Sequence, residues 1–115
     1  MITIYGKCPA KKNRYRVGRG KVYKDDVVVS YERNFLAQCG DYRNRLISSP
    51  FELVVDVYFE TIRPDLDNAV STVLDCLQSS SVITDDKNMI KLSARKFKDK
   101  IYPRVEFEIK ELNYE

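Results

Sequence analysis

The chain has 115 residues, of which 43% are hydrophobic and 32% are charged, so we expect one folded domain over residues 1–115. No apolar run approaches the roughly 20 residues that a membrane helix needs, and the first residues lack the pattern of a signal peptide. The sequence contains no histidine, which excludes imidazole catalysis and histidine-ligated metals.

The charges are distributed unevenly around a net charge of only +3. Residues 7–24 contain eight bases and no acid, and residues 91–104 contain six bases and one acid. Residues 56–86 contain seven acids and one base. Basic clusters attract phosphates, so the pattern favours a nucleic-acid partner, although a solvated lysine-rich surface explains either basic cluster alone.

The three cysteines, Cys8, Cys39 and Cys76, are odd in number and far apart. Such spacing is typical of neither a disulfide framework nor a zinc site, so we expect a reducing, cytoplasmic setting.

The first half of the chain predicts two short strands and a long helix. Residues 1–7 are rich in β-formers, residues 8–20 carry proline, asparagine and glycine as a loop does, and residues 21–23 favour a short second strand. From residue 26 to about residue 47, apolar side chains recur at helical spacing, which predicts one long helix.

The second half predicts a central strand, a helix and a hairpin. Residues 51–62 alternate apolar and polar side chains, and Pro64 ends the strand. Residues 67–78 carry a helical apolar stripe, residues 79–86 form a loop, and residues 90–112 read as a β-hairpin. This order predicts an α+β domain, a small mixed β-sheet with two helices packed on one face.

The junction between the central strand and the second helix carries "RPDLDN", residues 63–68. One structural explanation is that Asp65 caps the helix and Asn68 returns a bond. That explanation leaves Asp67 unaccounted for, and at 100° per residue Asp67 begins an acidic ridge along the helix with Ser71 and Asp75.

A second acidic stretch, "TDDKN" at residues 84–88, follows the same helix. We expect the loop to return Asp85 and Asp86 to the junction. Aspartates that converge without histidine suit Mg²⁺ or Mn²⁺. Because a metal there would activate water and offset charge on a phosphodiester, the residues favour a metal-dependent nuclease.

Residues 63–90 resemble the RusA family of Holliday junction resolvases, the crossover junction endodeoxyribonucleases. The family has D-x-D-N, a helix ending in D-x-L, a short turn and an aspartate pair. Here these positions are Asp65, Asp67, Asn68, Asp75, Leu77, Asp85 and Asp86. The first strand and the proline-, asparagine- and arginine-rich loop after it also resemble the family, so the likeness covers almost the whole chain.

The resemblance implies a RusA-like homodimer that resolves Holliday junctions and related branched DNA by paired symmetric nicks, in DNA recombination and repair. It implies Mg²⁺ as cofactor, with Mn²⁺ as a substitute, no membrane partner, and a bacterial cytoplasm, with phage and prophage genes as common sources. It assigns catalysis and metal binding to Asp65, Asp67 and Asp86, with Asp85 as an auxiliary ligand. The expected DNA-binding residues are the N-terminal bases Lys11, Lys12, Arg14, Arg16, Arg19 and Lys21.

One departure concerns catalysis. The family usually carries a lysine one helical turn after the second aspartate of D-x-D, and here that position is Ser71. Lys87, beside Asp86, and Lys12 are possible substitutes. The alternative function is therefore a catalytically weak branched-DNA-binding protein of the same fold. A small interaction domain with solvated acids is a third reading, and the likeness over the whole chain weighs against it.

Overall fold

The computed structural model describes residues 1–10, 15–18, 21–24 and 26–112, with side chains for residues 1–10 and 26–112. A four-stranded mixed sheet has the order β1-β6-β4-β5. Strand β4 pairs parallel with β5 and antiparallel with β6, and β6 pairs antiparallel with β1. The strands are β1 (Ile2–Tyr5), β4 (Phe51–Phe59), β5 (Met89–Lys98) and β6 (Arg104–Glu111). Because β4 lies between β5 and β6, these two strands do not pair with each other, and the β-hairpin predicted over residues 90–112 is wrong.

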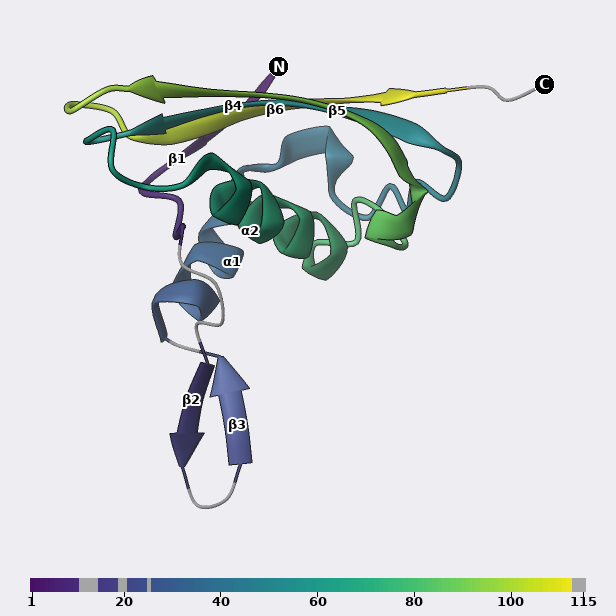
Figure 1. Cartoon of the computed structure of the whole chain (residues 1–115). Helices are drawn as coiled ribbons and strands as arrows, with labels where there is room; N and C mark the ends of the chain where they lie inside the picture. Colours follow the sequence, from purple (N-terminus) through teal and green to yellow (C-terminus); the bar gives the residue numbers. More distant parts are fainter. Residues whose placement is uncertain (11–14, 19–20, 25, 113–115) are drawn as a thin grey trace.

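Two helices, α1 (Asp26–Gln38) and α2 (Leu66–Ser79), lie on the same face of this sheet (Figure 1). Two short 3₁₀ turns, η1 (Gly40–Tyr42) and η2 (Asp86–Asn88), follow the helices along the chain. The predicted α+β class, with a mixed sheet and two helices, is confirmed. In the described part of the chain, neither helix is long and apolar enough to cross a membrane.

The core lies between the helices and the inner face of β4. Alternate residues of β4, from Phe51 to Phe59, are almost fully buried and face the helices. Phe35 of α1 stacks on Phe107 of β6 with ring centroids 5.5 Å apart, and so joins α1 to the sheet. Val73 of α2 is fully buried in the same core.

The outer face of β4 buries two acids although α1 and α2 both lie on the other face of the sheet (Figure 1). Glu52 is 8% exposed and Asp56 is 4% exposed. The Ser93 hydroxyl donates to Glu52 at 2.9 Å, and the Arg95 guanidinium donates to both Asp56 oxygens at 2.9 Å. Side chains of β5 therefore both cover these acids and satisfy their oxygens.

The helix expected to reach residue 47 ends at Gln38, so that boundary was wrong. Gly40 takes a φ of +61°, which stops the helix, and Asn44 and Leu46 also have positive φ. Ile47 instead forms a parallel bridge with Ile83, in the loop after α2. The chain thus turns away from the helix axis in order to bury Ile47.

The N-terminal segment contains one strand more than expected. Strand β2 (Tyr15–Gly18) falls in the predicted loop and pairs antiparallel with β3 (Lys21–Lys24), with Val17 opposite Val22. This two-stranded hairpin is separate from the four-stranded sheet (Figure 1).

Candidate metal and nucleic-acid site

Asp65 occupies the N-cap position of α2, at the end of the turn that leaves β4. Its backbone carbonyl accepts the Ala69 N–H at 3.3 Å, which begins the helix. Within the described part of the chain, however, its carboxylate makes no capping bond to a backbone N–H. The Asn68 amide donates to that carboxylate at 3.4 Å instead. The suggested cap by the side chain is therefore wrong, and the exposed carboxylate stays oriented toward the first turn of α2.

Asp67 lies in the first turn of α2 with an exposed side chain. Ser71 and Asp75 are exposed on the same side of the helix, and Val70 and Val73 are buried on the other, so the acidic ridge is confirmed. The Ser71 hydroxyl donates to the backbone carbonyl of Asp67 at 3.2 Å. Serine at this position thus stays on its own helix and brings no charge.

Asp85 and Asp86 lie at the opposite end of α2. The Asp86 N–H donates to the side-chain oxygen of Gln78, in the last turn of α2, at 3.2 Å. Asp85 caps η2, because its carboxylate accepts the Lys87 N–H at 2.9 Å. This bond from the backbone of Lys87 is the main reason that the pKa of Asp85 is lowered.

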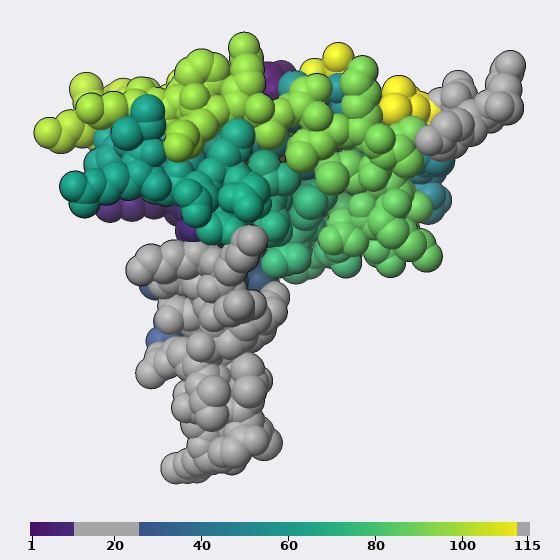
Figure 2. Space-filling view, viewed as in Figure 1, coloured from purple at the N-terminus to yellow at the C-terminus, as the bar shows by residue number. Residues whose placement is uncertain are grey.

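The two acidic pairs therefore do not meet within one chain. Gln78 follows Asp67 by eleven positions, which at 1.5 Å per residue is about 16 Å along the helix axis. Figure 2 shows the teal segment near residue 60 and the green segment near residue 85 on opposite sides of one face. Among the described residues, no group of three acidic or cysteine side chains is arranged to hold one metal ion.

Burial of the loop after α2 explains this separation. Val82 is fully buried and Ile83 is 1% exposed, and the N–H of Val82 donates to Leu77 at 2.9 Å. Both apolar side chains fix the loop to the C-terminal end of the helix. The expected return of Asp85 and Asp86 to the strand–helix junction is therefore wrong for a single chain.

The residues at the N-terminal end of α2 fit a hard divalent cation. Asp65 and Asp67 are exposed and carry carboxylate oxygens, and Mg²⁺ is usually held by one or two carboxylates while it keeps several waters. The N-terminus of a helix also favours negative charge nearby, which suits two aspartates at this position.

Most of the predicted DNA-binding residues cannot be placed. Lys11, Lys12, Arg14 and Arg19 lie outside the described residues. For Arg16 and Lys21, which belong to β2 and β3, the structure describes only the backbone.

Two lysines are relevant to the question of which residue replaces the lysine that the family usually carries at position 71. Lys87 belongs to η2 and so accompanies Asp86, far from Asp67 in the same chain. Lys96 of β5, which the sequence did not single out, donates from its ammonium to the backbone carbonyls of Ile62 at 2.9 Å and Pro64 at 3.1 Å. The parallel pairing of β4 with β5 brings Lys96 to this junction, and no local pattern in the sequence signals it.

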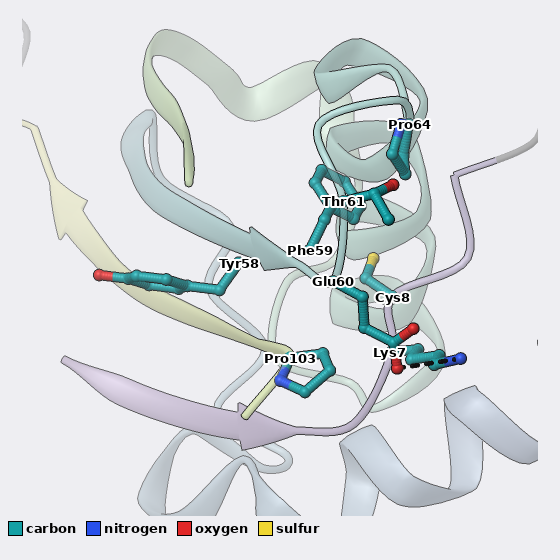
Figure 3. Close-up of a pocket in the computed structure, with 8 residues that line it drawn as sticks. All are labelled: Lys7, Cys8, Tyr58, Phe59, Glu60, Thr61, Pro64 and Pro103. Carbon is teal, nitrogen blue, oxygen red and sulfur yellow. Dashed lines mark ion pairs between the residues drawn. The ribbon is translucent and has the colours of Figure 1, made fainter. Parts of the chain in front are cut away.

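A pocket of about 220 Å³ lies beside the same turn (Figure 3). The Lys7 ammonium and the Glu60 carboxylate form an ion pair of 3.1 Å at this pocket. The full lining is Lys7, Cys8, Tyr58, Phe59, Glu60, Thr61, Pro64 and Pro103. Cys8 is buried, and burial raises the pKa of its thiol to about 12, so it carries no nucleophilic thiolate at neutral pH.

The comparisons with known proteins agree with the motif pattern. No curated protein matches the chain. The family model described as endodeoxyribonuclease RusA matches residues 6–110, which includes both acidic pairs and the basic N-terminal segment. By this match over nearly its full length, the chain belongs to the RusA endodeoxyribonuclease family.

Proposed function

We propose that this protein is a Mg²⁺-dependent, structure-specific endodeoxyribonuclease that resolves four-way junctions and related branched DNA by paired nicks. We place its activity in recombination and repair in a bacterial cytoplasm. The observation that carries the proposal is the pair of exposed carboxylates, Asp65 and Asp67, at the start of α2 in a chain of the RusA family.

In this proposal Asp65 and Asp67 would hold the metal, and the bond from the Asn68 amide orients the Asp65 carboxylate. When bound, Mg²⁺ supplies a water of lowered pKa and offsets charge on the scissile phosphate. The basic N-terminal segment, residues 7–24, binds phosphates and positions the DNA without reading its sequence.

We further propose that a homodimer completes the site. A twofold copy with its α2 antiparallel to the first would bring Asp86 and Asp85 of one chain to Asp65 and Asp67 of the other. Twofold symmetry then gives two equal sites, as two symmetric nicks require. Leu74 of α2 is only partly buried, and Ile90 and Leu92 of the neighbouring β5 are 43% and 44% exposed, so apolar surface is available for such packing.

The alternative function, a branched-DNA-binding protein that cuts weakly, is favoured by one observation. Ser71 contributes no charge beside Asp67, because a serine side chain is neutral, and its hydroxyl donates to the helix backbone. Against this alternative, aspartates that face DNA phosphates weaken binding unless a cation lies between them.

The deciding experiment is cleavage of an end-labelled synthetic four-way junction, with duplex and single-stranded DNA of the same sequence as controls. We expect cuts at symmetric positions in two opposing strands of the junction, in Mg²⁺ or Mn²⁺ and not in EDTA. Tight junction binding without metal-dependent cutting would favour the alternative function, and equal cutting of all three substrates would exclude structure specificity.

A further inference from the structure

Lys96 is the cation that the fold fixes against the turn before the D-x-D motif. In β5 it lies opposite Val57, whose side chain is fully buried under the helices, so Lys96 also faces the helix side of the sheet. Its ammonium donates to the carbonyl oxygens of Ile62 at 2.9 Å and Pro64 at 3.1 Å. The Pro64 carbonyl belongs to the peptide bond that joins Pro64 to Asp65, so one peptide unit separates the ammonium from the D-x-D motif.

Among the residues that the structure describes, the other bonds around this turn are longer or lie outside its centre. Within the turn, the Arg63 N–H donates to the Thr61 hydroxyl at 3.4 Å, a weak bond. The Asn68 amide reaches the Asp65 carboxylate at the same length, 3.4 Å. The Lys7–Glu60 ion pair of 3.1 Å lies at the start of the turn, with 72% of the Lys7 side chain exposed. The two bonds from Lys96 are charge-assisted and short, and they hold the turn at the residues on both sides of Arg63.

We propose that Lys96 is a positioning residue of the cleavage site: it holds the 60–65 turn so that Asp65 stays in place to bind the divalent cation. This inference rests on the proposed function for the identity of the ligand. The physical reason is that a turn without these two bonds samples more backbone conformations, and a carboxylate that moves with it binds metal less tightly. Lys96 belongs to β5, so its two hydrogen bonds hold the turn independently of α2 itself.

The direction in which substitution of Lys96 changes the metal affinity distinguishes a positioning role from a purely electrostatic one. A cation near two carboxylates repels a divalent metal, so removal of its charge alone should tighten metal binding. Loss of the two Lys96 hydrogen bonds should instead weaken metal binding, by about tenfold or more, as for other residues that orient metal ligands. The two explanations therefore predict opposite changes in one measurement.

The test is Mn²⁺ binding to the full chain without DNA, measured by electron paramagnetic resonance or calorimetry. Lys96→Met keeps a side chain of similar length and removes the N–H donors. Lys96→Arg keeps N–H donors for both carbonyls. Lys98→Met removes a charge two residues along on the same face of β5 and serves as the matched control. We expect weaker Mn²⁺ binding for Lys96→Met only, with Lys96→Arg and Lys98→Met close to wild type and with unchanged melting temperatures.

Unchanged or tighter Mn²⁺ binding by Lys96→Met would overturn the inference, and so would equal weakening by Lys98→Met. Hydrogen exchange of the amides in residues 60–65 provides a second measurement that needs no metal. We expect faster exchange in Lys96→Met than in Lys98→Met. If wild type neither binds Mn²⁺ nor cuts a junction, the proposed function fails. Faster exchange of residues 60–65 in Lys96→Met would still show that Lys96 holds the turn, and unchanged exchange would overturn that role.

Discussion

Asp65 and Asp67 lie two residues apart in the sequence, but different elements of the fold hold them in place. Asp65 ends the turn and is oriented by Asn68, whereas Asp67 belongs to the first turn of α2. A rigid helix fixes Asp67, and a turn fixed by Lys96 carries Asp65. We therefore expect substitution of Asp67 to act on the ligand alone, and substitutions around the turn to act through Asp65.

Asp67→Asn should reduce junction cleavage by at least about a hundredfold, because a neutral amide is a poor Mg²⁺ ligand. Junction binding should persist or tighten, because one charge that repels phosphate is removed. Cleavage and gel-shift assays at one salt concentration test both effects. Asp41→Asn, an exposed acid in η1, changes the charge equally and should leave cleavage intact. Cutting at the wild-type rate by Asp67→Asn would refute the metal-site assignment.

Ser71→Lys should raise the cleavage rate. Residue 71 lies one helical turn beyond Asp67, so a lysine there can reach a phosphate bound at the D-x-D motif. A preorganised charge of this kind can change a rate by about a hundredfold. Single-turnover cleavage of a junction measures the effect. If Ser71→Lys has no effect while Lys87→Ala abolishes cutting, then Lys87 already supplies the charge.

The cysteines should resist alkylation in the folded protein. Burial raises the pKa of Cys8 to about 12, and a pKa above the ambient pH means that the thiol stays protonated. At pH 8 the thiolate fraction of Cys8 should be roughly a thousandfold below that of an ordinary cysteine, and its iodoacetamide reaction should slow accordingly. Mass spectrometry before and after unfolding checks this, and rapid labelling of native Cys8 would contradict it.

At the scale of elements, α2 separates the two halves of the acidic pattern. Its N-terminal end follows β4 and carries the D-x-D motif, and its C-terminal end is tied to η2 and the aspartate pair. Because β5 starts after η2 and runs parallel to β4, it returns to the N-terminal end of α2 with Lys96. One helix and one parallel strand thus decide which charges meet.

The packing of α1 on the sheet depends on Phe35. Its ring is fully buried and stacks on Phe107, so Phe35→Ala should lower the free energy of unfolding by about 3–5 kcal/mol. Leu36→Ala is the neighbouring control, since Leu36 is 38% exposed and its truncation should cost less than about 1 kcal/mol. Urea denaturation of both variants tests the difference, and similar losses would contradict this account of the core.

At the scale of the whole molecule, the proposed homodimer makes a prediction that separates a site shared between subunits from a site within one chain. If Asp67 of one subunit works with Asp86 of its partner, a heterodimer of Asp67→Asn and Asp86→Asn has one intact site and one doubly altered site. If each site lies within one chain, both sites of that heterodimer are broken.

We therefore expect the mixed heterodimer to nick a cruciform plasmid to the open circle, although each variant homodimer is inactive. Wild type should produce linear plasmid by paired nicks. Subunits with two different tags, purified in succession, give the heterodimer, and light scattering checks its mass. An inactive heterodimer, or a monomer at micromolar concentration with and without junction DNA, would refute the dimeric site.

The sequence by itself determined the α+β class, the central strand and the second helix, because side-chain periodicity is a local property. In residues 51–59 every second side chain is apolar and faces the helices, and the apolar stripe of α2 includes Val70, Val73 and Leu77, which are buried. The D-x-D motif at the strand–helix junction was predictable for the same reason, and its place in the RusA family followed from motif order.

Only the tertiary structure decided which charged groups lie together. Asp86 stays at the far end of α2 because Val82 and Ile83 are buried there, and that burial depends on contacts far away in sequence. Lys96 reaches the D-x-D junction because β5 pairs parallel with β4, and Arg95 covers Asp56 through the same pairing. Strand pairing and loop burial join residues that no local pattern relates, so the sequence revealed the acids while the fold decided which of them meet.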